Sequence, residues 1–160
     1  MNLPEYPLKI RKQENDRDEI YDPFRKQWVA LTPEERVRQR FLTWMVVDKN
    51  YPPGLIAVEK GIKVNGRLRR FDALIYNKKG DPVVLLEFKA PSVQLNNATI
   101  EQIAAYNLGI GAALLIVSNG YKHYCIKMDY LNRTFALLDD VPDYVKLSLH
   151  LPATNRAAKK

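Results

Sequence analysis

The fold is decided by Arg70-Phe-Asp-Ala-Leu-Ile-Tyr-Asn-Lys-Lys-Gly-Asp-Pro-Val-Val-Leu-Leu-Glu-Phe-Lys-Ala-Pro91. Two apolar runs within it, Phe71–Tyr76 and Val83–Phe88, are separated by a cluster of turn-forming residues. This pattern predicts a β-hairpin. A loop of two or four residues would pair residues whose numbers sum to 159. Asp72 and Glu87 would then lie directly opposite each other, with Cβ atoms about 5 Å apart.

This pairing of two carboxylates is unfavourable, because like charges opposite each other on a sheet repel by roughly 0.2–1 kcal/mol. Lys89 follows Glu87 by two residues, so it shares the same face and would lie opposite Arg70. Two interpretations follow. Either Lys89 and Arg70 neutralise the acids in a salt-bridged patch, or a divalent cation, Mg²⁺ (or Mn²⁺), binds between Asp72 and Glu87.

A helix is predicted to begin at Thr32-Pro33-Glu34-Glu35 and to end near Val47. Thr32 suits the N-cap and Pro33 the first helical position, while the Glu35 carboxylate would bond back to the Thr32 amide in a capping box. Glu34 instead shares a helical stripe with three apolar residues, Val37, Phe41 and Met45. An acid in the first turn is favourable by about 0.3–1 kcal/mol even without a further role.

A second helix is predicted over Asn96–Gly109, with Asn97 as N-cap and Gly109 as the stop signal. Gln102 and Tyr106 are four residues apart, so they project together from one side of this helix. Between the helices we expect three strands, the first over Leu55–Glu59. After the second helix we expect two strands that turn at Asn119-Gly120 and an edge strand over Thr134–Leu138.

The hairpin resembles the core of the PD-(D/E)xK nucleases, in which an acid on one strand faces an acid-x-Lys motif on its partner. Asp72 and Glu87-Phe88-Lys89 carry this match, with Phe71 where the family name has Pro. Other segments resemble the N-terminal nuclease domain of the motor (R, or HsdR) subunits of type I restriction enzymes. They are Tyr21-Asp-Pro-Phe-Arg25, Leu31-Thr-Pro-Glu-Glu-Arg-Val-Arg-Gln39 and Gln102-Ile-Ala-Ala-Tyr106-Asn107. The resemblance spans about residues 20–128.

The resemblance implies a restriction-endonuclease-like core and a metal-dependent nuclease that hydrolyses phosphodiester bonds in DNA, with RNA left open. Asp72, Glu87 and the Phe88 backbone carbonyl would hold Mg²⁺ (or Mn²⁺). Lys89 would orient the attacking water or offset charge on the phosphate. Of the two helix acids, Glu34 is favoured over Glu35 as an additional ligand.

Contacts to nucleic acid are expected from four side chains: Gln102, Tyr106, Arg70 and Arg38. For Gln102 and Tyr106 the other interpretation is an ordinary half-exposed pair, and for Arg70 a solvated strand end. The alternative function is a catalytically inactive nucleic-acid-binding module that serves a partner nuclease. Cleavage of both DNA strands by a single-site enzyme would require a homodimer or a partner subunit.

Length and composition frame these expectations. The 160 residues predict one α/β domain with a mixed central sheet flanked by helices, and the net charge of +7 favours a polyanionic partner. We expect an irregular or hairpin-forming arm at 1–30, the nuclease-like domain at 31–150 and a disordered basic tail at 151–160. Cys125 is the single cysteine, and no apolar run approaches the roughly 20 residues of a membrane span. A soluble cytoplasmic protein with no membrane association is therefore expected.

Overall fold

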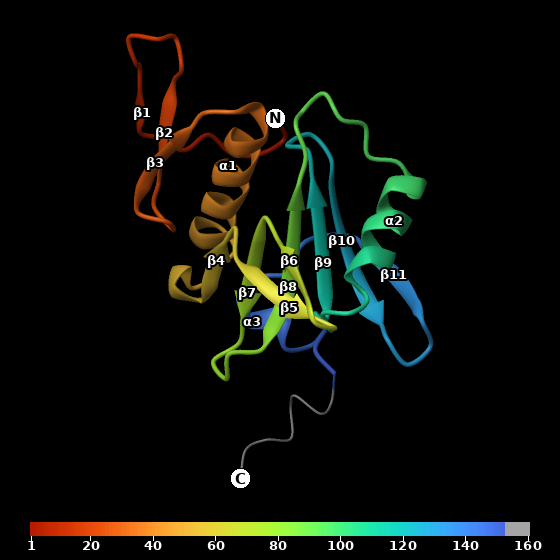
Figure 1. The fold of residues 1–160 in the computed structure, drawn as a ribbon. Helices are drawn as coiled ribbons and strands as arrows, with labels where there is room; N and C mark the ends of the chain where they lie inside the picture. The colour runs from red at the N-terminus through yellow and green to blue at the C-terminus, as the bar shows by residue number, and fades with distance from the viewer. Residues whose placement is uncertain (153–160) are drawn as a thin grey trace.

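The computed structural model describes residues 1–152 and shows a central sheet with a helix on each side (Figure 1). The sheet contains β4 (Ile56–Val58), β7 (Ala73–Tyr76), β8 (Pro82–Phe88), β9 (Leu114–Ser118), β10 (His123–Asp129) and β11 (Thr134–Leu138). Its strand order is β11-β10-β9-β8-β7-β4, with β8 and β9 parallel and the other neighbours antiparallel. Helices α1 (Pro33–Val47) and α2 (Asn97–Asn107) flank it. The predicted α/β class with a mixed sheet is confirmed, and the arrangement is consistent with a restriction-endonuclease-like core.

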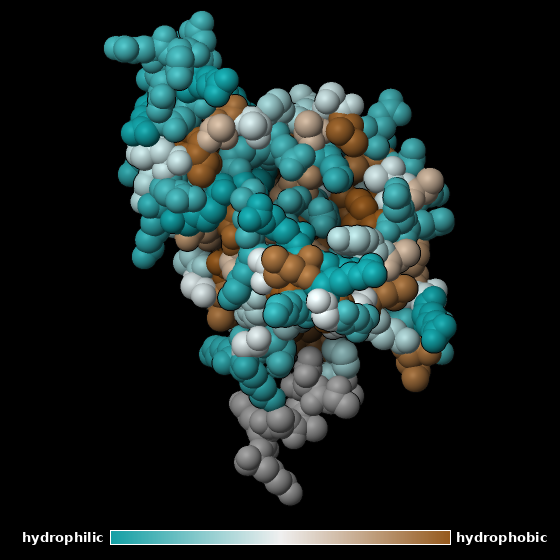
Figure 2. Space-filling view, viewed as in Figure 1, coloured by the Kyte–Doolittle hydropathy of each residue, from teal (hydrophilic) through white to brown (hydrophobic). Residues whose placement is uncertain are grey.

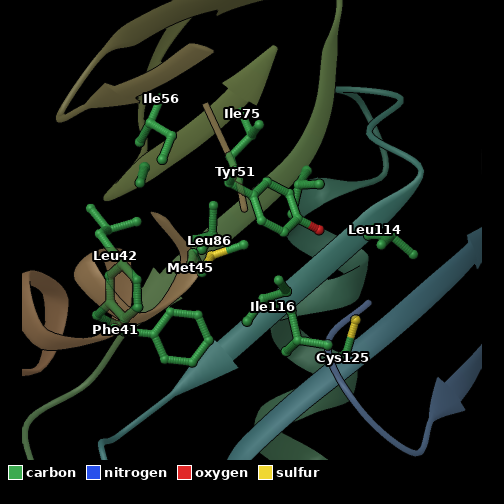
Figure 3. Close-up of a cluster of buried hydrophobic side chains, with 14 of the residues drawn as sticks. Phe41, Leu42, Met45, Tyr51, Ile56, Ile75, Leu86, Leu114, Ile116 and Cys125 are labelled. Atoms are coloured by element: carbon green, nitrogen blue, oxygen red, sulfur yellow. The ribbon is translucent and has the colours of Figure 1, made fainter. Parts of the chain in front are cut away.

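Each face of the sheet has its own hydrophobic core, because side chains alternate between the faces along every strand. On the α1 side, Phe41 and Met45 pack against the sheet near Leu86, as Figure 3 shows. On the α2 side, Ile100 and Leu85 belong to a second buried cluster. Fully burying a side chain of this kind stabilises the fold by about 1.5–3 kcal/mol. The two helices are therefore fixed on opposite faces of β8.

The start of α1 follows the prediction only in part. The Thr32 hydroxyl accepts the Glu35 N–H at 3.0 Å, which confirms Thr32 as the N-cap. The predicted reciprocal bond, from the Thr32 N–H to the Glu35 carboxylate, does not form. The Thr32 N–H donates instead to the Ala30 carbonyl at 3.0 Å, so this part of the prediction is wrong. The buried Glu35 carboxylate instead accepts from two arginines and from Gln39. A buried carboxylate gains more from charged donors than from one amide.

The N-cap of helix α2 lies one residue earlier than predicted. Asn96, not Asn97, is the N-cap, and its side-chain oxygen accepts the Thr99 N–H at 2.9 Å. The side chain of an N-cap must reach an amide two or three residues ahead while its own backbone stays extended, and Asn96 has that backbone. Gln102 and Tyr106 are exposed on this helix.

The β7–β8 hairpin has the predicted register but a different turn. Ala73 pairs with Leu86 and Ile75 with Val84, so the numbers sum to 159 as expected. The loop has three residues, 78–80, between Asn77 and Asp81, with Gly80 at φ +86°. That loop alone would shift the register by one. A bulge at Val83, between the pairs that include Tyr76 and Ile75, restores it.

Five strands, rather than three, lie between the two helices. The additional pair is β5 (Gly61–Val64) and β6 (Arg67–Arg70), which form a separate two-stranded sheet that we call the β5–β6 ribbon. The β9–β10 connection is also longer than predicted, because Ser118 pairs with His123 and leaves four residues between them. The predicted edge strand over Thr134–Leu138 is confirmed as β11.

The N-terminal arm forms a three-stranded antiparallel sheet of β1 (Ile10–Arg11), β2 (Glu19–Asp22) and β3 (Gln27–Ala30), seen beside α1 in Figure 1. Leu3 precedes it and is buried in the α1-side core. Two short helical elements complete the described chain, η1 (Pro53–Leu55) and α3 (Tyr144–Leu147). Within residues 1–152, none of the helices has the length and apolar character needed to cross a bilayer. The predicted tail lies outside the described residues from position 153 onward.

Candidate active site

One long hairpin carries the first predicted acid to the edge of the sheet. The β4–β7 pair and the β5–β6 ribbon share a single register, in which paired numbers sum to 131. Two bonds continue it between them: Glu59 N–H to the Asp72 carbonyl at 3.0 Å and Phe71 N–H to the Lys60 carbonyl at 3.2 Å. The chain bends here, with Glu59 at φ +50°. Asp72 therefore lies at the point where the hairpin leaves the central sheet.

The structure brings Asp72 and Glu87 together at this bend. Regular pairing of β7 with β8 ends at Ala73 and Leu86, and each of these residues is adjacent in sequence to one of the two acids. Asp72 then turns its carboxylate onto the neighbouring strand, where Oδ2 accepts the Phe88 N–H at 2.7 Å. The two carboxyl groups lie close enough for Asp72 to raise the pKa of Glu87.

Glu87 is the most strongly perturbed of these acids. The pKa of its carboxyl is raised from 4.5 to about 7, first by burial and then by the negative charge of Asp72, while Lys89 partly opposes both effects. A carboxyl group that is hard to ionise beside another acid is a common feature of functional sites. At neutral pH this carboxyl holds its proton for a large part of the time.

Lys89 and Glu34 face the same two acids. The Lys89 amide donates to the Ser118 carbonyl at 2.9 Å, which extends the β8 side of the sheet. Glu34 is exposed in the first turn of α1, where partial burial and then Asp72 raise its pKa and Lys89 lowers it. We call Glu34, Asp72, Glu87 and Lys89 the acid–lysine patch.

The salt-bridged interpretation of this patch is wrong. In the part of the chain that the structure describes, Lys89 forms no ion pair with the acids. Arg70 does not lie opposite Lys89, because it pairs with Gly61 in the ribbon, and its charge acts on Glu59. The reason is the bend, which takes the residues before Asp72 out of the plane of the β7–β8 hairpin.

A second group of charges lies beside the patch, and most of its members were not identified from the sequence. Arg25 contacts Glu35 at 3.0 Å and Glu59 at 3.3 Å, and Arg38 contacts Glu59 at 2.9 Å and also pairs with Glu35. Asp22 completes the group by pairing with Arg25. We call these five residues the arginine-bridged cluster. The sequence feature that points to Asp22 and Arg25 is the motif Tyr21-Asp-Pro-Phe-Arg25. In this motif the Asp22 side chain accepts the Phe24 N–H, two residues ahead, at 2.8 Å.

The cluster changes the interpretation of Arg38. Its side chain is 6% exposed and its guanidinium is occupied by Glu35 and Glu59, so it does not reach a bound polyanion. Tyr106 is 52% exposed, but its ring lies 4.4 Å from the Arg69 guanidinium and its carbonyl accepts from the same arginine. Gln102 is exposed on α2. The Phe88 side chain is in the core beside Phe41, so only its backbone borders the patch.

The oxygen atoms of Asp72 and Glu87 suit a hard divalent cation. Mg²⁺ is often held by one or two carboxylates, with water in the remaining positions. A cation here would also relieve the repulsion that raises the Glu87 pKa. Across residues 1–152, no group of three or more His, Cys, Asp or Glu side chains is arranged to hold a metal ion. The donors present therefore fit a two-carboxylate site better than a cage of protein ligands.

Comparisons with known proteins agree with this fold. A fragment structure of a protein assigned as the HsdR subunit of a type I restriction enzyme from Vibrio vulnificus YJ016 is similar, with a TM-score of 0.56 and 17% identity. The similarity covers 81% of this chain and 27% of that one, so it concerns a minor part of the larger protein. No curated protein matches the chain. The family described as Type I restriction enzyme R protein N terminus matches residues 33–142, more than half of the sequence, and the chain therefore belongs to that family.

Proposed function

We propose that the acid–lysine patch hydrolyses phosphodiester bonds in DNA in a metal-dependent reaction of the PD-(D/E)xK type, within a restriction system. The observation that carries the proposal is the proximity of Asp72 and Glu87, which form no ion pair within the described part of the chain, with the Glu87 pKa raised to about 7. Such a pair is unfavourable for folding alone, and a divalent cation would make it favourable. Membership of the restriction family supports the same conclusion.

Each residue of the patch has a separate task. Asp72 and Glu87 would hold the cation together with the Phe88 carbonyl, and the cation would supply Lewis-acid stabilisation of phosphate charge and a lower pKa for water. The Phe88 N–H fixes the Asp72 carboxylate in place. The Lys89 ammonium, which forms no ion pair with any residue that the structure describes, would orient the attacking water or offset negative charge on the phosphate. Glu34 would add negative charge at the edge of the site.

A second candidate is a nucleic-acid-binding module without catalysis, acting beside a partner nuclease. The observation in its favour is that the described residues hold no group of three or more metal-binding side chains. The intact Asp72, Glu87 and Lys89 favour the nuclease, since a site without catalytic work gains nothing from keeping two repelling acids. The two candidates differ in one measurable product, the cut strand.

The test compares cleavage by the wild-type chain with cleavage by Asp72→Asn and Lys89→Ala, in Mg²⁺, in Mn²⁺ and in EDTA. We expect each substitution to reduce the cleavage rate by at least about 10²-fold, because each removes a group that acts on the reacting phosphate. Lys78→Ala, in the β7–β8 turn, is the matched control and keeps its activity. Full cleavage by both site variants would remove the mechanism. Wild-type binding with no cut product in either metal would favour the binding module.

A further inference from the structure

The β5–β6 ribbon carries an unusual concentration of positive charge. Residues 60–70 contain five cations, Lys60, Lys63, Arg67, Arg69 and Arg70, and no acid. In Figure 1 the ribbon lies in the foreground, in front of the central sheet. Figure 2 shows the same face as mainly hydrophilic, with several small groups of hydrophobic residues among the hydrophilic ones.

The structure separates the cations that stabilise the protein from those that do not. Lys60 lies 5.3 Å from the Tyr76 ring, Arg69 lies 4.4 Å from the Tyr106 ring, and the charge of Arg70 acts on Glu59. Lys63 and Arg67 are both exposed, and within the described chain neither forms an ion pair. Two cations at the end of the ribbon are thus available to a partner.

The two sides of the ribbon have different surroundings. Ile62 and Arg69 pair on one side, where Val64 is also buried and packs so closely on Gly109 that a Cβ there would lie 2.8 Å from it. Lys63 and Leu68 pair on the other side, whereas Arg67 pairs with Val64 and lies on the Val64 side at the tip of the ribbon. Leu68 is 73% exposed. The open side of the ribbon therefore presents an apolar side chain beside a cation, and the second cation lies at the tip on the opposite side.

The ribbon is held in a fixed position relative to the acid–lysine patch. Asn65 and Gly66 both have positive φ, at 50° and 74°, in the two-residue loop between Val64 and Arg67. This loop suits the twist of a hairpin. The register of the ribbon continues through the bend into β4 and β7, so the ribbon cannot shift along its axis without moving Asp72.

We propose that the β5–β6 ribbon enters the major groove of duplex DNA and holds the duplex beside the acid–lysine patch; the position of the cut, but not the binding, rests on the proposed nuclease function. A two-stranded β-ribbon is one of the elements that the major groove, about 12 Å wide, admits. Lys63 and Arg67 contact phosphates on the groove walls, and Leu68 contacts base edges such as the thymine methyl group.

Dimensions and aromatic positions favour a duplex. The chain from Arg67 to Asp72 spans at most roughly 17 Å, its fully extended length, which equals about five base-pair rises of 3.4 Å. Ribbon and patch therefore contact one duplex within about half a helical turn. A protein that binds single strands uses open aromatic rings as stacking platforms. Here the nearby rings of Tyr76 and Tyr106 are already occupied by Lys60 and Arg69.

The test measures binding of a random-sequence duplex of about 20 base pairs by fluorescence anisotropy in EDTA, where no cleavage occurs, over a range of salt concentrations. We expect Lys63→Ala/Arg67→Ala to weaken duplex binding about tenfold or more at about 0.1 M salt and to reduce the slope of log K against log salt by about 2. Leu68→Ala is expected to weaken binding with an unchanged slope, because it removes no charge. Lys78→Ala/Lys79→Ala removes the same charge from the β7–β8 turn and leaves duplex affinity nearly unchanged.

Several outcomes would overturn the proposal. They are an unchanged affinity in the ribbon variant, an equal loss in the turn variant, an equal loss for a single strand, or full competition by polyglutamate of equal charge. Circular dichroism and thermal unfolding, unchanged in all variants, show that the fold is retained. Because the assay contains no metal, loss of binding in the ribbon variant supports the ribbon even if the wild-type chain never cuts DNA. Conversely, a chain that cuts DNA with unchanged ribbon-variant binding refutes the ribbon and keeps the nuclease.

Discussion

Two groups of acids lie on either side of the first turn of α1, and they are treated in opposite ways. In the arginine-bridged cluster, Glu35 and Glu59 are held by two guanidinium groups, and Arg38 lowers the Glu59 pKa. In the acid–lysine patch, burial and a neighbouring acid raise the Glu87 pKa, and one unengaged lysine is the nearby cation. The adjacent residues Glu34 and Glu35 belong to different groups.

This difference indicates which acids stabilise the fold. Pairing satisfies the buried carboxylates of the cluster, so their removal should harm stability. Within residues 1–152 the acids of the patch form no ion pair, although the chain has many basic residues and a net charge of +7. Local interactions that conflict with the rest of a fold are expected at functional sites. Measurements of stability and of the response to metal, made on variants of the cluster and of the patch, therefore test whether the two groups have different roles.

The largest expected effect is on the cluster. Arg38→Ala should reduce the free energy of unfolding by about 3 kcal/mol, because it removes two charge-assisted hydrogen bonds and leaves Arg25 as the remaining arginine that holds the buried Glu35 carboxylate. Arg36→Ala, two residues earlier on α1 and exposed, is the matched control and should change stability by less than about 0.5 kcal/mol. Urea unfolding measures both. Equal stability of the two variants would contradict the structural role of the cluster.

The next effect is a pH dependence that belongs to the patch. The folded protein binds the Glu87 proton more tightly than the unfolded chain does, since its pKa is about 7 instead of 4.5. Its free energy of unfolding in EDTA should therefore decrease as pH rises through this window, by at most about 3 kcal/mol between pH 5 and 8. Glu87→Gln should flatten the dependence. Glu59, whose pKa is lowered, acts oppositely and only at acid pH, where stability decreases as pH falls.

A smaller effect is expected from metal. At ten times its dissociation constant, Mg²⁺ or Mn²⁺ should stabilise the folded wild-type chain by about 1.4 kcal/mol, seen as a rise in the midpoint of thermal unfolding. Asp72→Asn should abolish the rise, and EDTA should reverse it in the wild type. Arg36→Ala serves again as the control and should respond as the wild type does. A rise that survives in Asp72→Asn would place the ion elsewhere.

The sequence predicts the strand pairing at this site better than it predicts the partners of the charged side chains. Alternating apolar residues and a single turn determine that Leu85 and Leu86 face opposite cores, which places Glu87 near Asp72. The loop length was wrong, and the register survived because the Val83 bulge offset the three-residue turn. No local pattern predicts that cancellation, since a bulge depends on packing of both Val83 and Val84 into one core.

One motif contains both Asp22 and Arg25, but the complete arginine-bridged cluster could not be predicted because its other members come from separate segments. Arg25 follows β2, Glu35 and Arg38 lie on α1, and Glu59 lies at the bend after β4. Periodicity shows which residues share a face within one element, but it gives no distance between elements. The same limit explains Arg38, which was expected to contact nucleic acid and is buried against Glu59 instead.

The smallest effect concerns the adjacent glutamates, and it separates the two groups most sharply. Glu34→Gln should change the free energy of unfolding by less than about 0.5 kcal/mol, because losing its interaction with the helix N-terminus is offset by relief of its repulsion with Asp72. It should nevertheless weaken the metal-induced rise in the unfolding midpoint, since it removes negative charge from the patch. Glu35→Gln should do the reverse, with a clear loss of stability and a wild-type metal response. If Glu34→Gln proves the more destabilising of the two, the division between a paired structural cluster and an unpaired functional patch does not hold.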